Sequence, residues 1–169
     1  AGTPAVDGDT LVVGAGTGNG DGRAFAFALA DGAPRWNARV GASFQPDSAP
    51  TIDGRDVFLV DELGGVDRLD LGSGQRIWHR ALREAVLIAR PAVVGDAGRA
   101  GVVVTDAARE VVTLDRATGR VRVRRTASGV PMRVVRSGNL VLVAQRLVIR
   151  NQIQAYSADR LAGPARSRG

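Results

Sequence analysis

The chain has 169 residues, of which 44% are hydrophobic and 24% charged, which is enough apolar material for one or two packed domains. Its 22 glycines and its low aromatic fraction of 4% favour short strands joined by tight turns over a helical bundle. Because the sequence has no cysteine and one histidine, disulfide scaffolds, thiolate metal sites, thiol nucleophiles and His-rich metal centres are excluded. No apolar run approaches the roughly 20 residues of a membrane-spanning helix.

The charge is divided unevenly along the chain. All 23 basic residues are arginines, and residues 1–84 carry a net charge of −4 while residues 85–169 carry +10. Such a basic half can bind an anionic surface, either nucleic acid or membrane headgroups. The interpretation that we prefer is a solvated face of strands, since the aromatic residues that single-strand binders place between their arginines are missing. Nucleic acid is therefore not expected as a partner.

The sequence contains an internal repeat. Similar phrases begin at Pro4, Pro50, Pro91 and Pro131, with spacings of 46, 41 and 40 residues. An apolar, β-branched segment follows each phrase and is predicted to be a strand, at residues 10–13, 57–60, 101–105 and 140–144. A segment that alternates in polarity comes next, at residues 24–29, 66–71, 110–115 and 148–156. In the first three repeats, a Gly-containing turn and a fourth strand then complete the unit.

A period of 40 to 46 residues with four strand-like segments is typical of β-propeller blades. We therefore predict an all-β propeller of about four four-stranded antiparallel blades, at residues 3–48, 49–89, 90–129 and 130–163. The last blade lacks its fourth strand, so we expect an open edge there that the remaining blades of a ring or self-association would cover. Residues 164–169 are predicted to be a disordered tail.

The turn that closes each repeat carries a recurring pattern. Its matching residues are Ala26, Gly32 and Trp36, then Asp70, Gly74 and Trp78, then Asp115, Thr118 and Gly119. This pattern resembles the tryptophan-docking motif of the pyrroloquinoline-quinone-like (PQQ-like) β-propeller repeats, with departures at Ala28, Arg68 and Val123. The resemblance implies that the Trp of one blade stacks on the Gly peptide of its neighbour, since glycine leaves that face bare. The expected docking residues are Gly32, Trp36, Gly74, Trp78 and Gly119.

The resemblance also carries expectations about function. Rings of this family usually have seven or eight blades, so the chain is expected to be a fragment of such a ring. Quinone-dependent members hold PQQ and calcium with a vicinal cysteine pair, acidic ligands and an aromatic floor, whereas this sequence has no cysteine and three glutamates. We therefore expect no PQQ, no calcium, no catalytic residue and no metal site.

The non-catalytic branch of the family includes outer-membrane assembly lipoproteins and kinase sensor domains. By this resemblance we expect a scaffold that binds a protein partner or a small ligand in the periplasm, outside the cell or attached to the envelope. Two rival functions stay open. One is a propeller enzyme, which would be a hydrolase, a lyase or a remnant of a quinone-dependent dehydrogenase. The other is binding of an anionic surface or of nucleic acid through the Arg-rich C-terminal half, although nucleic acid is the less expected of the two.

Three loop regions supply the candidate binding residues. The connection at residues 42–48 contains Phe44, Gln45 and Asp47, and a predicted hairpin turn contains Asp61 and Glu62. Asn19 and Asp21 lie in a Gly-rich turn whose oxygens could bind a cation, although a simple lengthened hairpin turn accounts for the sequence. Turn chemistry likewise explains the acidic pair, because hairpins select Asp and Gly.

Two further features lie on predicted outer strands. Arg120, Arg122 and Arg124 alternate with valines and should share one face, which is either a wet strand face or an anion-binding stripe. His79 follows Trp78, so alternation turns it away from the Trp side. We interpret it as a surface histidine, since the sequence nominates no catalytic partners for it.

Overall fold

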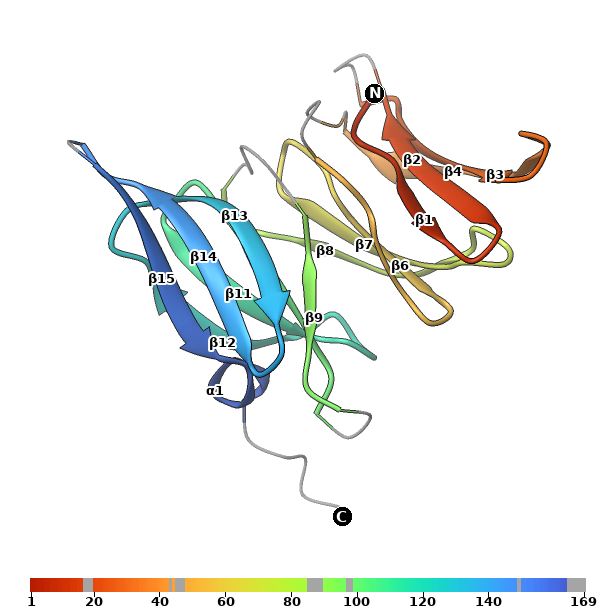
Figure 1. The fold of residues 1–169 in the computed structure, drawn as a ribbon. Coiled ribbons are helices and arrows are strands. Elements are labelled where there is room, and N and C mark those ends of the chain that lie inside the picture. Colours follow the sequence, from red (N-terminus) through yellow and green to blue (C-terminus); the bar gives the residue numbers. More distant parts are fainter. Residues whose placement is uncertain are drawn as a thin grey trace. The chain divides into compact units, whose positions relative to one another are not determined.

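The computed structural model describes residues 1–16, 20–42, 44, 48–84, 90–96, 99–148 and 150–163. These residues form four antiparallel sheets and one short helix (Figure 1). The chain divides into two compact units, residues 1–90 and residues 91–169, and each holds two sheets. Within the described residues, no helix is long and apolar enough to cross a membrane.

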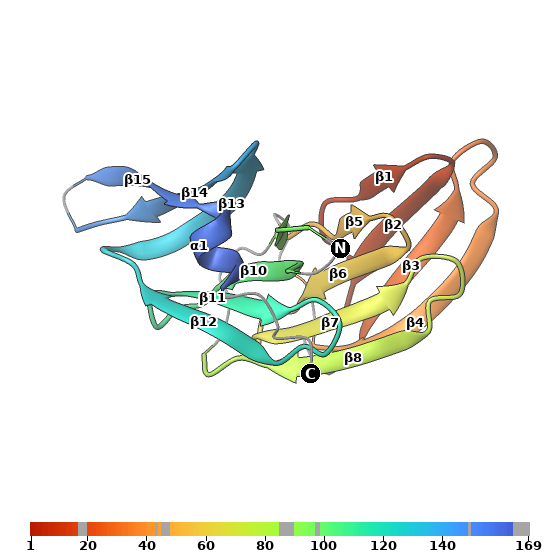
Figure 2. The same ribbon diagram turned by 90° about the horizontal axis from the view of Figure 1, so that it is seen from below.

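The first unit contains sheets 1 and 2, in which consecutive strands pair in chain order. Sheet 1 comprises β1 (Ala5–Asp7), β2 (Thr10–Ala15), β3 (Gly22–Ala28) and β4 (Pro34–Gly41). Sheet 2 comprises β5 (Thr51–Asp53), β6 (Asp56–Val60), β7 (Gly65–Asp70) and β8 (Arg76–Ala81). The two sheets lie face to face (Figure 2) and share a core in which Val12 and Ala26 of sheet 1 meet Val57 and Leu69 of sheet 2.

The second unit contains sheets 3 and 4. Sheet 3 comprises β9 (Ala92–Val94), β10 (Gly101–Thr105), β11 (Glu110–Asp115) and β12 (Val121–Thr126). Sheet 4 has three strands, β13 (Val130–Ser137), β14 (Leu140–Arg146) and β15 (Asn151–Ser157), followed by helix α1 (Ala158–Ala162). The sequence analysis did not anticipate α1. Its buried residues Ala158, Leu161 and Ala162 complete the core between these sheets together with Val103 and Val141.

The repeat is visible in backbone detail. In sheets 1, 2 and 3 the pairing of the third and fourth strands shifts register at the same position, between Ala26 and Phe27, Arg68 and Leu69, and Thr113 and Leu114. The turn before each fourth strand contains a glycine with positive φ, which is 73° at Gly32, 71° at Gly74 and 67° at Gly119. Glycine adopts this conformation without steric cost, so the turn explains why it recurs in the sequence.

A tryptophan of sheet 1 binds the backbone of sheet 2. The indole Nε1 of Trp36 donates a hydrogen bond to the Leu71 carbonyl at 2.7 Å. Its ring covers Gly74 so closely that a Cβ at this glycine would lie 2.6 Å from indole carbons. In the second unit, Val123 takes the equivalent position and faces Gly163, where a Cβ would lie 3.4 Å from the valine methyl.

The second tryptophan is more deeply buried. Trp78 is 9% exposed, and its ring lies 6.1 Å from the ring of Phe58 in a tilted arrangement. Trp36, in contrast, is half-buried and packs against the margin of the core that sheets 1 and 2 share. Both rings thus pack against neighbouring apolar groups, to different depths.

In sheets 2 and 4, a buried side-chain oxygen near the end of the second strand accepts a hydrogen bond from a backbone amide of the segment that leads into that sheet. The Oδ2 atom of Asp61 accepts a hydrogen bond from the Ala42 amide at 3.0 Å, and Oε1 of Gln145 accepts one from the Gly129 amide at 2.8 Å. Asp106 is the corresponding residue of sheet 3 and is 2% exposed. Its Oδ2 has no hydrogen-bond partner among the described residues. Burial raises the pKa of the Asp106 carboxyl.

The contact of Trp36 with Gly74 should contribute measurably to the free energy of unfolding. We expect Trp36→Ala to lower the free energy of unfolding by about 3 kcal/mol, since Trp36 is only half-buried and so belongs at the low end of the range for such truncations. Gly74→Ala should be more destabilising than Gly32→Ala, because both glycines have positive φ but a Cβ at Gly32 meets open space. Urea denaturation measures these differences. Equal costs for the two glycine variants would contradict the contact.

The buried carboxyl predicts a pH effect. Because the pKa of Asp106 is raised in the folded protein, its contribution to stability is fully present below the unfolded pKa and is lost as pH rises through the folded pKa. Relative to the parent, Asp106→Asn should therefore gain stability in urea denaturation between about pH 3 and about pH 7. Hydrogen bonds from Ser73 lower the pKa of Asp70, so Asp70→Asn is a control with the opposite expected slope. Parallel slopes for the two variants would contradict this account.

Candidate functional site

An open groove of about 540 Å³ lies in the first unit, where the outer strands of sheets 1 and 2 approach each other. We call it the Arg–His groove. It is lined by Gly20, Arg39, Gly41, Ala42, Asp61, Leu63, Gly65, Arg76, His79 and Ala81. The end of β4 lines one side of the groove, and β8 lines the opposite side. The turn between β6 and β7 forms the floor of the groove. Glycine and alanine account for half of the lining residues, and their small size leaves the space.

Asp61 lies at the floor of the Arg–His groove as a structural acceptor. Its Oδ1 accepts hydrogen bonds from the Leu63 amide at 2.9 Å and the Gly65 amide at 2.7 Å, and its Oδ2 accepts the Ala42 amide. A Cβ at Gly65 would lie 2.5 Å from Oδ2, and one at Gly41 would also collide with this carboxylate. The two glycines therefore make room for Asp61, which ties the end of sheet 1 to the turn of sheet 2.

Asp67 is a buried carboxylate behind the lining that contacts two lining residues, Arg76 and His79. The carboxylate of Asp67, which is 1% exposed, accepts from Arg76 Nε at 2.8 Å and lies 3.1 Å from Nδ1 of His79. Burial raises the pKa of Asp67, and the charges of Arg76 and His79 oppose this effect. An ionised carboxylate only accepts, so a hydrogen bond between ionised Asp67 and His79 requires a proton on Nδ1.

The groove presents hydrogen-bond donors more than acceptors. Arg39 is exposed, and among the described residues the Gly20 carbonyl, at 3.3 Å, is the one acceptor recorded for its guanidinium. Arg76 uses Nε for Asp67 and Nη2 for the Arg39 carbonyl, at 2.7 Å, while its side chain stays 42% exposed. His79 has a side-chain exposure of 41%. Arg39 and Arg76 can donate hydrogen bonds to an acceptor that enters from solvent, and His79 lies beside them.

The lining offers little for catalysis. The described lining residues include no hydroxyl side chain, so the His79–Asp67 pair has no hydroxyl nucleophile beside it. Across the part of the chain that the structure describes, no three His, Asp or Glu side chains lie close enough together to hold a metal ion.

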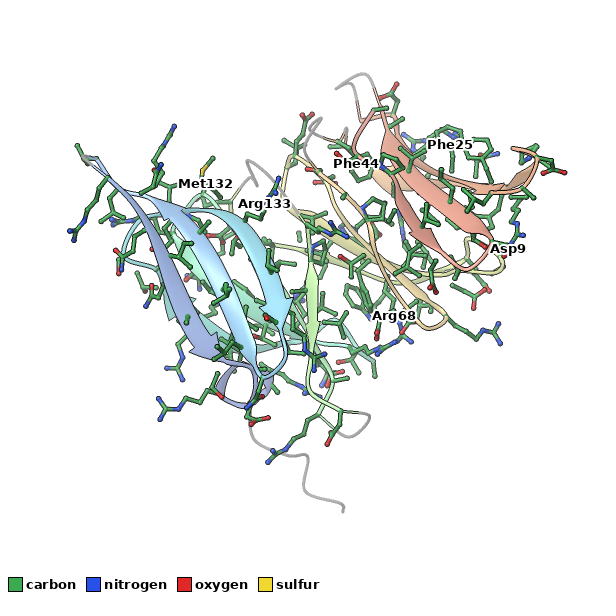
Figure 3. All side chains as sticks on the ribbon, viewed as in Figure 1. Asp9, Phe25, Phe44, Arg68, Met132 and Arg133 are labelled. Atoms are coloured by element: carbon green, nitrogen blue, oxygen red, sulfur yellow. The ribbon has the colours of Figure 1, made fainter. Side chains whose placement is uncertain are left out.

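The candidate loop residues predicted from the sequence are dispersed. Asp61 lies in the Arg–His groove, and Glu62 follows it in the same turn. Phe44, labelled in Figure 3, is 8% exposed and packs on Gly14, so its ring serves the core of the first unit. Asp21 is exposed just before β3. Asn19, Gln45 and Asp47 lie outside the described residues.

The predicted arginine stripe lies in the second unit. Arg122 pairs with Asp115 and also donates to the Arg99 carbonyl at 2.8 Å, and Arg124 pairs with Glu110. Arg120 precedes β12 and is exposed. Two of the three guanidinium groups therefore neutralise carboxylates of their own sheet, and the anion-binding stripe stays a prediction.

The sequence analysis missed Arg39 and Arg76 and did not connect His79 with Asp67. The available signal was strand register: Asp67 and His79 are directly opposite each other in the pairing of β7 with β8. Residues in this relation share a face and lie within side-chain reach. Counting back from the shared turn pairs Asp67 with Trp78 instead, because the register shift between Arg68 and Leu69 lies between the turn and this pair.

Comparison with known proteins gives a consistent fold. A family model described as outer membrane protein assembly factor BamB matches residues 1–164. The crystal structure of BamB from Moraxella catarrhalis matches with a TM-score of 0.67 and 20% identity over 93% of this chain and 46% of that chain. The computationally designed Ika4 protein matches with a TM-score of 0.69 and 15% identity over 91% of this chain and 88% of the other.

A europium-containing methanol dehydrogenase is a more distant structural neighbour, with a TM-score of 0.55 and 17% identity over 72% of this chain and 23% of that chain. A search of curated proteins found no match. At these identities the solved structures show the fold, which is an all-β propeller, and the chain spans about half the length of the Moraxella protein, at 46%. From the match of the family model over residues 1–164, the chain belongs to the PQQ-like β-propeller family described as outer membrane protein assembly factor BamB.

Proposed function

We propose that the chain is part of a propeller scaffold that binds a protein partner in the cell envelope and catalyses no reaction. The description of the matching family model names an assembly factor, and this supports a role in binding other proteins. The observation that carries the proposal is the Arg–His groove. Its buried acids hold the fold together, while Arg39, Arg76 and His79 keep exposed surface for an incoming partner.

The same arrangement weighs against the enzyme alternative. A general base needs a reacting group within hydrogen-bond reach, and the described lining of the groove supplies His79 without a nucleophile. The sequence also lacks the cysteine pair that the quinone-dependent members use. We therefore propose a function without PQQ or calcium.

Site-specific photo-crosslinking in the source cells tests the proposal. Leu63 is 70% exposed on the lining of the groove, so a photoreactive phenylalanine analogue at this position should crosslink to a discrete protein. Arg39→Glu should abolish the adduct, because it reverses the charge of an exposed donor in the groove.

Leu29 is a matched control site, since it is 50% exposed in the same unit but does not line the groove. The analogue at this position should give no such adduct. If Leu63 gives no discrete adduct, or if Arg39→Glu leaves it unchanged, the partner does not bind at this groove and the proposal fails. Cell fractionation of the same cells checks the envelope location.

A further inference from the structure

We infer that the Arg–His groove binds the carboxylate of a glutamate side chain of the protein partner. The identity of the ligand as part of a protein rests on the proposed function. The preference for a carboxylate rests on the residues of the groove itself, and each can be tested without the other.

The donors of the groove match a carboxylate. A guanidinium is planar and presents N–H groups in a fixed fork, which fits the two oxygens of a carboxylate. Arg39 has this fork exposed, since its recorded contact is a long one of 3.3 Å to the Gly20 carbonyl. Arg76 is held in place by its bonds to Asp67 and the Arg39 carbonyl, which reduces the conformational entropy that ligand binding would cost.

The acids of the groove limit the charge of the ligand. Arg39 and Arg76 bring two positive charges to the groove, and Asp61 and Asp67 bring two negative ones. Asp67 pairs with Arg76 and Asp61 accepts backbone amides, so Arg39 is the lining guanidinium without a carboxylate partner among the described residues. A monoanion can pair with Arg39, whereas a phosphate dianion would meet stronger repulsion from Asp61 and Asp67. The expected ligand is therefore a monoanion.

The apolar part of the lining favours glutamate over a free anion. Leu63, which is 70% exposed, and Ala81 are apolar residues of the lining. These groups can cover the methylene carbons of a glutamate side chain, which adds apolar burial that acetate or phosphate cannot supply. The partner chemistry that fits the groove is thus a carboxylate on a short aliphatic stem.

The one histidine of the sequence gives a direct probe of binding. The ring protons of His79 can be followed by NMR in the purified chain while a blocked Ala-Glu-Ala peptide is added, with blocked Ala-Gln-Ala as the neutral counterpart. We expect a saturable shift with the glutamate peptide and none with the glutamine peptide. Arg39→Gln should weaken the affinity about tenfold or more, as loss of a charged hydrogen-bond donor does.

Arg80→Gln is the matched control. Arg80 is an exposed arginine of β8, the strand that carries His79, and its side chain alternates away from the face of His79. This substitution removes the same charge and should leave the affinity unchanged. Equal weakening by both variants would show general electrostatic attraction and overturn the inference, and so would equal binding of the two peptides. Inorganic phosphate that binds as tightly as the glutamate peptide would also contradict it.

The two experiments fail separately. A glutamate peptide that binds the purified chain, without a crosslinked protein in cells, would support the carboxylate site and contradict the proposed function. A crosslinked partner combined with no response of His79 to the glutamate peptide would support the scaffold and overturn the carboxylate inference.

Discussion

Sheets 1 and 2 are joined by side chains of one sheet that bind backbone atoms of the other. Trp36 donates to the Leu71 carbonyl and covers Gly74, and Asp61 accepts the Ala42 amide. Both contacts require bare backbone, which glycine provides beneath the indole and beside the carboxylate. A sheet with one apolar face has many ways to pack on another, so directional contacts of this kind select one arrangement.

The Arg–His groove follows from the same constraint. Asp61 needs glycine at positions 41 and 65, and these glycines, together with the small side chains of Ala42 and Ala81, leave open space along the lining. Charged side chains of β4 and β8 then line the space. A carboxylate that serves the packing of the sheets thus also creates a surface where Arg39 and His79 can meet a ligand. The second unit uses a related contact through Gln145 and Gly129.

Periodicity in the sequence predicted most of the fold, because alternation and glycine turns are local properties. The strands at residues 101–105 and 110–115 were predicted with the bounds that the structure has. Helix α1 was missed, since five residues carry no period and its burial depends on sheets 3 and 4. Of the binding residues predicted from the sequence, Asp61 alone lies among the described lining residues of the groove, and Glu62 follows it in the same turn. Arg39, Arg76 and His79 come together through register and sheet packing, which no short motif encodes.

Hydrogen exchange at the indole of Trp36 tests the central contact most directly. The sequence has two tryptophans, so the two indole N–H signals are readily assigned by substitution of one. If Trp36 binds the Leu71 carbonyl against Gly74, its indole proton should exchange slowly, and Gly74→Ala should speed this exchange more than Gly32→Ala does. An indole proton that exchanges at the rate of an exposed tryptophan would contradict the account.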